Sequence, residues 1–240
     1  MKIASSLVTL LALGVSAFAQ EQNLFNGKDL SGWEGNTALW SVKDGVIHGE
    51  TVPDPEKPEK STLKHNTFLV WKGGTVGDFE LHAKFRITTP WGNSGIQYRS
   101  KELPAGPDGP IVSGYQADFE AGKTYSGINY EEKGRGILAK RGEKVVIRAN
   151  PENPKKPKIE VTGSVGVSDE IQAAIHITEW NDYVVIAKGN HLQQFINGKQ
   201  TVDIIDEDEA GAKEGILALQ MHAGAPMVVE FKDLVLSPAK

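Results

Sequence analysis

Gly114-Tyr-Gln-Ala-Asp-Phe-Glu120 alternates apolar and polar side chains. Successive side chains of a β-strand point to opposite faces, so a strand here places Gln116, Asp118 and Glu120 together on one face. A face that only meets water usually mixes Lys, Thr and Ser with its acids. Two carboxylates and an amide in one row therefore favour a functional site on a β-sheet over an ordinary solvated surface.

The sequence on either side of this segment is also typical of β-structure. Turn signals recur at short spacing between runs rich in Val, Ile, Phe and Trp, which is the pattern of a sandwich or barrel. Strands are predicted on both sides of a turn at Asp44-Gly45 within residues 40–48, and over residues 79–87, 183–187, 191–196, 200–205, 215–221 and 227–236. The one predicted helix covers residues 169–175, with Ser168 as its N-cap.

Three proline-rich stretches interrupt this pattern, at residues 52–66, 103–110 and 150–158. Proline has no N–H to donate to a sheet, so these stretches are predicted to be surface loops within one domain. The chain has no cysteine, and its stability must therefore come from packing and not from disulfides. The expected domain is a single all-β unit over residues 20–240.

The first nineteen residues have the pattern of a cleavable signal peptide. Lys2 precedes an apolar run from Ile3 to Val15, and Ala17-Phe-Ala19 is an A-x-A cleavage signal. We therefore expect export to the periplasm or the cell exterior. The formal charge of −5 and the lack of a basic stripe argue against a nucleic-acid partner, and no later segment is apolar enough for membrane insertion. A neutral small molecule or polysaccharide is the expected partner.

Two other predicted strands carry rows of polar side chains. Gln97 and Arg99 share one face of the strand that follows the bend at residues 92–95, and Gln220 and His222 share one face of residues 217–222. We expect these rows to converge with that of residues 116–120 on the concave outer face of one sheet. Residues 128–136 are predicted to fold over this face as a loop, with Tyr130, Glu131 and Arg135 as contributors.

Several short motifs, spread over nearly the whole chain after residue 19, match those of a known domain family. They are Leu24-Phe-Asn-Gly-Lys-Asp-Leu-Ser-Gly-Trp33, Trp40-Ser-Val-Lys-Asp-Gly-Val46, Gly77-Asp-Phe-Glu-Leu81, Gly92-Asn-Ser-Gly-Ile96, Gly114-Tyr-Gln-Ala-Asp118, Glu179-Trp-Asn-Asp-Tyr183, Asn197-Gly198 and Gly215-Ile-Leu-Ala-Leu-Gln220. With these motifs the chain resembles the 3-keto-disaccharide hydrolase domain family. The resemblance implies a concanavalin A-like jelly-roll sandwich of two antiparallel sheets. It also implies cleavage of glycosides oxidised at C3, by 1,2-elimination and then hydration. Many family members have Glu-x-Gln on the central strand, where this chain has Gln116-Ala-Asp118.

That chemistry requires a base near C2, a proton donor for the leaving oxygen and a group that stabilises an enolate. The hypothesis from the sequence assigns the base to Asp118 or His222 and the acid to Glu120. Arg99, or a divalent cation held by the oxygen-rich side chains, would stabilise the enolate. Substrate binding is assigned to seven residues: Gln97, Arg99, Gln116, Tyr130, Glu131, Arg135 and Gln220.

Two alternatives remain open at this stage. An ordinary glucanase on the same fold could use Asp118 and Glu120, which as same-face neighbours lie about 7 Å apart along a strand, but Gln116 stands where the nucleophilic Glu is expected. A lectin-like carbohydrate-binding module could instead stack sugars on Trp33, Trp91 and Tyr115. Binding without turnover would distinguish such a module from an enzyme.

Overall fold

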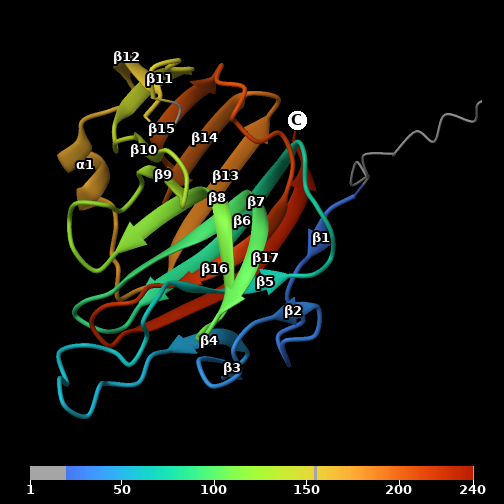
Figure 1. Cartoon of the computed structure of the whole chain (residues 1–240), viewed down its shortest axis with the longest axis vertical. Coiled ribbons are helices and arrows are strands. Elements are labelled where there is room, and N and C mark those ends of the chain that lie inside the picture. The colour runs from blue at the N-terminus through green and yellow to red at the C-terminus, as the bar shows by residue number, and fades with distance from the viewer. Residues whose placement is uncertain (1–19, 154–155, 240) are drawn as a thin grey trace, which may run out of the picture.

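The computed structural model describes residues 20–153 and 156–239. The predicted signal peptide lies outside these residues. Two β-sheets pack face to face, and Figure 1 looks through both layers, with β7 and β8 drawn over β6 and β13. No helix in the described part of the chain is long and apolar enough to cross a membrane.

The smaller sheet has seven strands and carries the polar rows. Its order is β10 (Gly136–Ala139), β9 (Asn129–Glu132), β8 (Gly109–Glu120), β7 (Asn93–Gly106), β16 (Ile216–Met221), β5 (Thr67–Trp71) and β2 (Trp33–Glu34). All of its neighbouring strands are antiparallel.

The larger sheet has ten strands and covers the inner face of the smaller one. Its order is β12 (Lys158–Ser164), β11 (Glu143–Arg148), β15 (Lys199–Asp206), β14 (His191–Ile196), β13 (Asn181–Lys188), β6 (Phe79–Ile87), β17 (Val228–Pro238), β4 (Val46–Glu50) and β3 (Trp40–Lys43), and β1 (Gln22–Asn23) pairs with β17. One pair, β11 with β15, is parallel, in contrast to the expected antiparallel sheet. The long connection through β12, β13 and β14 provides the crossover that a parallel pair requires.

The core lies between the sheets and follows the alternation in the sequence. On β6 the alternate residues Phe79, Leu81, Ala83, Phe85 and Ile87 are buried, and the polar side chains between them face outward. Phe85 meets Phe119 of β8 with ring centroids 4.0 Å apart, so the two sheets interlock at this point. Since Tyr115, Ala117 and Phe119 all enter this core, the alternate residues of β8 must face away from it.

The predicted hairpin turns are confirmed. Asp44 and Gly45 have φ angles of 50° and 76° and join β3 to β4, as expected for a two-residue type I′ turn. Asn197 and Gly198 join β14 to β15 in the same way.

Two local predictions were wrong. Residues 103–110 form the β7–β8 hairpin, not a loop, because the pairing of β7 with β16 ends at Ser100. Beyond that point β7 is an edge strand, and Pro104 there removes no hydrogen bond from a third strand. The helix α1 (Ser168–Ala173) begins one residue earlier and ends two residues earlier than predicted, and Val167 is its N-cap, with no capping side chain.

Candidate active site on the smaller sheet

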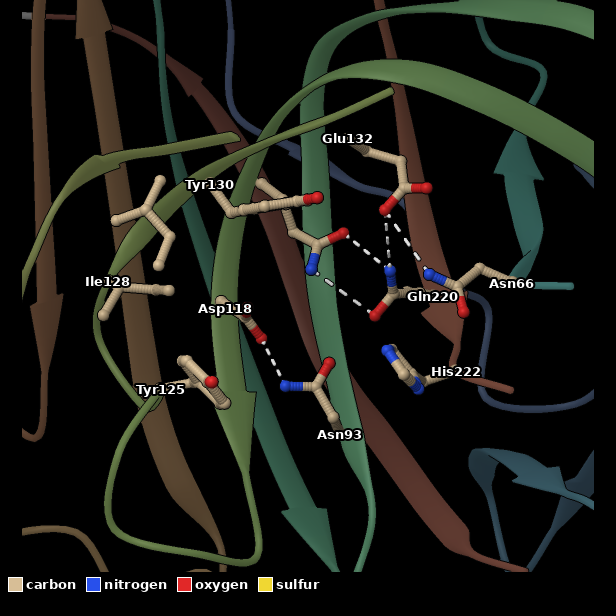
Figure 2. A pocket seen from close by; sticks show the side chains of 11 residues that line it. Asn66, Asn93, Asp118, Tyr125, Ile128, Tyr130, Glu132, Gln220 and His222 are labelled. Carbon is tan, nitrogen blue, oxygen red and sulfur yellow. Dashed lines mark hydrogen bonds between the residues drawn. The ribbon is translucent and has the colours of Figure 1, made fainter. Parts of the chain in front are cut away.

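A pocket of about 300 Å³ lies on the face of the smaller sheet that points away from the core (Figure 2). Its floor comes from β7, β8, β9 and the end of β16, and loops close its sides. The lining residues are Asn66, Asn93, Gln116, Asp118, Tyr125, Ile128, Tyr130, Glu132, Ile137, Gln220 and His222. Amides, carboxylates and an imidazole thus meet in one hollow with only two aliphatic side chains.

Strand register sets the width of this pocket. Asp118 of β8 lies opposite Gly95 of β7, and Asn93 lies opposite Glu120. β16 pairs with the other edge of β7, so Asp118 and His222 stand on strands about 10 Å apart, with β7 between them. Figure 2 shows Asp118 and His222 on opposite sides of Asn93. The gap between the two titratable groups can therefore admit a small molecule.

Gly95 keeps the floor of the pocket low. A Cβ atom at this position would lie 2.5 Å from Cγ of Gln116, which is far inside contact distance. The glycine therefore lets the Gln116 side chain lie across β7 toward β16. This explains the second glycine of the Gly92-Asn-Ser-Gly-Ile96 motif.

Three buried glutamines and a glutamate form a hydrogen-bonded row across the floor, which we call the glutamine row: Gln97, Gln116, Gln220 and Glu132. Nε2 of Gln220 donates to Oε1 of Gln116 at 2.9 Å and lies 3.4 Å from Oε2 of Glu132. The amide of Gln97 contacts the amide of Gln116 at 2.5 Å. Each glutamine is at most 1% exposed, so these contacts replace water and hold the amides in place.

Asp118 is the most strongly perturbed acid of the pocket. Only 6% of the residue is exposed, and burial raises the pKa of its carboxyl well above the usual range. The charge of Glu120 raises the pKa further, whereas Nδ2 of Asn93, which donates to Oδ1 of Asp118 at 2.9 Å, lowers it. Burial is the largest of these effects, and it favours the neutral carboxylic acid over the carboxylate, which is the form that can donate a proton.

The other titratable groups are also shifted by burial. Burial lowers the pKa of His222, which keeps its imidazole neutral and able to accept a proton. Burial raises the pKa of Glu132 and of the Tyr130 hydroxyl, and the charges of Glu132 and Asp118 raise that of Tyr130 further. Acids whose pKa values are raised and a histidine whose pKa is lowered therefore face the same space, which is the arrangement expected of an acid–base site.

The carboxylate and histidine side chains of the pocket are not arranged as a metal site. Across residues 20–153 and 156–239, no group of three or more His, Asp and Glu side chains is arranged to hold a metal ion. The two pocket carboxylates are separately engaged, Asp118 by Asn93 and Glu132 by amides. The divalent cation suggested by the sequence thus has no ligand cluster in the described residues.

Residues 20–237 match the family model described as a 3-keto-alpha-glucoside-1,2-lyase-like domain. The chain belongs to this family. No curated protein sequence matches the chain.

Solved structures share the fold of this 3-keto-alpha-glucoside-1,2-lyase-like domain at low identity. A Bacillus subtilis protein of unknown function with a galectin-like fold has a TM-score of 0.59 at 12% identity, over 92% of this chain and 97% of that one. A candidate glycosyl hydrolase from Parabacteroides distasonis has a TM-score of 0.52 at 19% identity, over 92% and 94% of the two chains. At such identities the likeness shows the sandwich fold alone.

The structure brings together most of the residues predicted for the site. Gln116 and Asp118 line the pocket from β8, Gln220 from β16 and His222 from the position just after β16, and Tyr130 reaches it from β9. Gln97 lies directly beneath, in the glutamine row. The convergence of polar rows from separate strands is therefore as predicted.

Glu120, predicted as the catalytic acid, lies outside the lining of the pocket and binds the backbone of the loop that follows β8. Its Oε1 accepts the backbone N–H groups of Thr124 and Tyr125 at 2.6 and 2.9 Å. The carboxylate thereby fixes the loop between β8 and β9. β8 ends at Glu120, so the side chain can turn into this loop while Asp118 remains in the pocket.

Arg99 does not face the pocket. It has a φ of 45° at a register shift in β7, and this bulge turns its side chain out of the alternation assumed from the sequence. Its guanidinium is fully buried and donates to the carbonyl oxygens of Gly77 and Gly189 and to Asp78. Arg99 thus joins the smaller sheet to loops of the larger one.

Residues 128–136 form the hairpin β9–β10, not a loop, and only part of it reaches the pocket. Tyr130 and Glu132 face outward, whereas Glu131 faces inward and pairs with Arg135 at 2.8 Å. Arg135 also pairs with Asp206 of β15 at 2.7 Å. We call Arg135, Glu131 and Asp206 the buried ion cluster, and it fixes β9 against the larger sheet.

Sequence reasoning missed Glu132, Asn93, Asn66 and Tyr125. Glu132 could have been found from its same-face spacing with Tyr130, had residues 129–132 been predicted as a strand. The proposed stacking platform is also revised, since Trp33 and Tyr115 lie in the core and Trp91 is 52% exposed.

Proposed function

We propose that this protein cleaves glycosides of 3-keto sugars by 1,2-elimination and then hydrates the product. The observation that carries the proposal is that Asp118 and His222 line one pocket from either side of β7, where burial raises the pKa of Asp118 and lowers that of His222. Membership of the lyase-like family supports the reaction class. The ring to be cleaved fits between the two residues, above the glutamine row.

In the elimination step, His222 removes the proton at C2, which the C3 ketone has made acidic. The electron pair of the C2–H bond passes into the ketone as an enolate. The C1–O bond then breaks, a C1–C2 double bond forms, and the leaving oxygen takes the proton of Asp118. His222 ends protonated and Asp118 ionised, the reverse of their resting states.

In the hydration step, the same two groups return to their starting states. The ionised Asp118 takes a proton from water as the water oxygen bonds to C1, and the protonated His222 returns a proton to C2. The two steps together amount to hydrolysis, with the sugar still oxidised at C3. The raised pKa of Asp118 favours its reprotonation and the lowered pKa of His222 favours loss of its proton, so both groups return to the states in which they began.

Tyr130 is the proposed donor to the enolate oxygen. Its hydroxyl points over the pocket in Figure 2, and burial raises its pKa, so the proton stays in place near neutral pH. This replaces the enolate role that the sequence gave to Arg99. Loss of one such donor typically lowers kcat by about 100-fold or more, so Tyr130→Phe should have an effect of this size.

The decisive experiment measures consumption of a 3-keto-disaccharide by the purified protein, with and without a chelator. Asp118→Asn and His222→Ala should each lower kcat/KM by about 100-fold or more. Asp182→Asn and His82→Ala are matched controls, because both residues belong to the larger sheet and have well-exposed side chains. If both pocket variants keep the kcat/KM of the wild-type protein, the roles assigned to Asp118 and His222 are wrong. If the wild-type protein consumes no 3-keto-glycoside, the proposed function is wrong.

An ordinary glucanase mechanism has less support. It requires a second carboxylate over the substrate beside Asp118, and the Glu120 carboxylate is occupied by backbone N–H groups of its own loop. Cleavage of an unoxidised β-glucan would revive this alternative. Calorimetric binding of oligosaccharides without any turnover would instead indicate a lectin-like module.

We also propose that the protein is exported, because of the signal-peptide pattern in residues 1–19. Mass spectrometry of protein recovered from the periplasm or medium should give Gln20 as the first residue. Retention of Met1 in that fraction contradicts a cleaved signal.

A further inference from the structure

The larger sheet extends beyond the smaller one at the end that carries β12. β12 is the last strand of its sheet and lies at one end of the molecule, beside β11 (Figure 1). The smaller sheet ends at β10, which contacts β11 and β15. No strand within residues 20–153 and 156–239 pairs with the outer edge of β12, and all seven of its residues are exposed. This strand therefore has no outer neighbour and little cover from the facing sheet.

Apolar side chains gather on the uncovered face of β12. Ile159 and Val161 pair with core residues of β11, and cross-strand partners share one sheet face. Ile159 is 39% exposed, Val161 is 57% exposed, and Ile137 of β10 is 39% exposed. These three are among the seven large hydrophobic side chains that are exposed in the described part of the chain. With Leu138, Ala139, Lys140 and Glu143 they line a groove of about 230 Å³, and such a surface is typical of an interface.

β12 also has an open edge for strand pairing. It has seven residues, whereas the other strands that end the two sheets, β3, β10 and β2, have four, four and two. Monomeric proteins usually keep edge strands short, because the unpaired N–H and C=O groups bind another strand. Thr162 has no paired position on β11, and this bulge ends the regular part of β12. The segment available for pairing is therefore Lys158 to Val161.

The charges of this segment are complementary to those of a second copy of it. In an antiparallel pair centred on Ile159, Lys158 of each copy lies opposite Glu160 of the other, and the two Ile159 side chains meet. Arg148 binds Oε2 of Glu160 and leaves Oε1 for a second cation. A pair centred on Glu160 would instead place two carboxylates opposite each other. Two-fold symmetry about Ile159 thus forms two ion pairs from one strand.

We propose that the protein forms a two-fold symmetric dimer through β12, in which the larger sheets of two copies join edge to edge. The apolar side chains of the two β12 strands then lie side by side and shield one another from water. The contact involves few residues of each copy, and interfaces at the small end of the range bind weakly, so the dimer should form at micromolar concentrations. This inference does not depend on the proposed function.

Sedimentation velocity between about 1 and about 200 µM tests the dimer. The mean mass of the wild-type protein should rise toward twice the monomer mass as the concentration increases. Val161→Lys places a charge on the apolar face and should raise the dimer Kd by about tenfold or more. Val52→Lys is the matched control and should leave the Kd unchanged. Val52 is 56% exposed, close to the 57% of Val161, and it follows β4, which lies at the opposite end of the molecule from β12 (Figure 1).

An exchange of charges tests the register of the pair. Glu160→Lys places two ammonium groups opposite each other and should raise the Kd by about tenfold. Adding Lys158→Glu restores opposite charges across the interface, so the Kd of the double variant should return to within about threefold of wild type. Position 158 is the cross-strand partner of Arg148, so the double variant also keeps an ion pair within each copy.

Hydrogen exchange of the wild-type protein is a second measurement that needs no variant. Amides of β12 should exchange more slowly at about 200 µM than at about 2 µM, whereas those of β3, at the other end of the same sheet, should not change. A wild-type protein that stays monomeric at about 200 µM overturns the proposal. So does a dimer that Val161→Lys leaves intact, a double variant that dimerises as weakly as Glu160→Lys alone, or protection that appears at β3 and not at β12.

Discussion

Replacement of Arg135 by methionine should be among the most destabilising single changes in this chain. The Arg135 side chain is 3% exposed and pairs with Glu131 and with Asp206, which is 1% exposed. Methionine keeps much of the volume but removes the only guanidinium in the buried ion cluster. Three buried carboxylates, those of Glu131, Asp206 and Asp208, then lose their cationic partner, and breaking a buried ion pair in this way typically costs about 3–5 kcal/mol.

This cost translates into a large shift of the unfolding temperature. For chains of this size, 1 kcal/mol shifts Tm by about 2–4 °C, so Arg135→Met should lower Tm by about 6–20 °C. Thermal unfolding followed by circular dichroism at pH 7 measures the shift. The effect should persist in 1 M salt, because buried pairs are screened little.

Arg148→Met is the matched control for this prediction. Arg148 likewise pairs with more than one carboxylate, those of Glu160 and Glu207, but the three side chains are 49%, 63% and 47% exposed. Exposed pairs contribute about 0–1 kcal/mol, which corresponds to less than about 4 °C. If Arg135→Met shifts Tm no more than Arg148→Met does, the argument from burial is refuted.

Three further predictions concern the pocket. Because burial raises the pKa of Asp118, the folded state loses stability as the pH rises from the carboxyl pKa of the unfolded chain through the raised pKa of the folded one. Asp118→Asn should therefore raise Tm relative to wild type at pH 8 and not at pH 3. An equal difference in Tm at both pH values would contradict this. Gly95→Ala places a Cβ atom 2.5 Å from Cγ of Gln116 and should lower kcat/KM, whereas Gly163→Ala, whose Cβ meets nothing closer than 3.6 Å, should not. Glu120→Gln should speed amide hydrogen exchange in the loop that follows β8, and unchanged protection there would mean that the carboxylate does not hold the loop.

Alternation and turn spacing in the sequence predicted a β-sandwich or barrel, and the family resemblance selected the sandwich. β6 and β14 have the predicted bounds, because each alternates regularly between core and solvent over its whole length. The same rule placed Gln116 and Asp118 on the outer face of β8, since Tyr115, Ala117 and Phe119 are required in the core. Burial of the apolar side chains on one face of the strand thus places the polar side chains between them on the other face.

The site residues that the sequence misplaced lie where alternation ends. Arg99 sits at a bulge with a positive φ, and Glu120 is the last residue of its strand. The Arg99 side chain is oriented by a contact with a residue distant in sequence, the carbonyl oxygen of Gly189, and no local sequence pattern predicts such a contact. Glu131 likewise faces inward, because it pairs there with Arg135, which in turn pairs with Asp206 of β15.

The glutamine row has a direction. Each amide has one oxygen and one nitrogen, so when Gln220 turns its nitrogen toward Glu132, the orientation of Gln116 is constrained, and through it that of Gln97. The Gln97 amide gains partners when reversed, with its nitrogen 3.0 Å from the carbonyl oxygen of Tyr115. That reversal extends along the whole row only if Glu132 carries a proton to donate to Gln220, and burial raises the pKa of Glu132. A single proton on Glu132, at one end of the row, thereby determines which amide atoms the floor of the pocket presents to a bound molecule.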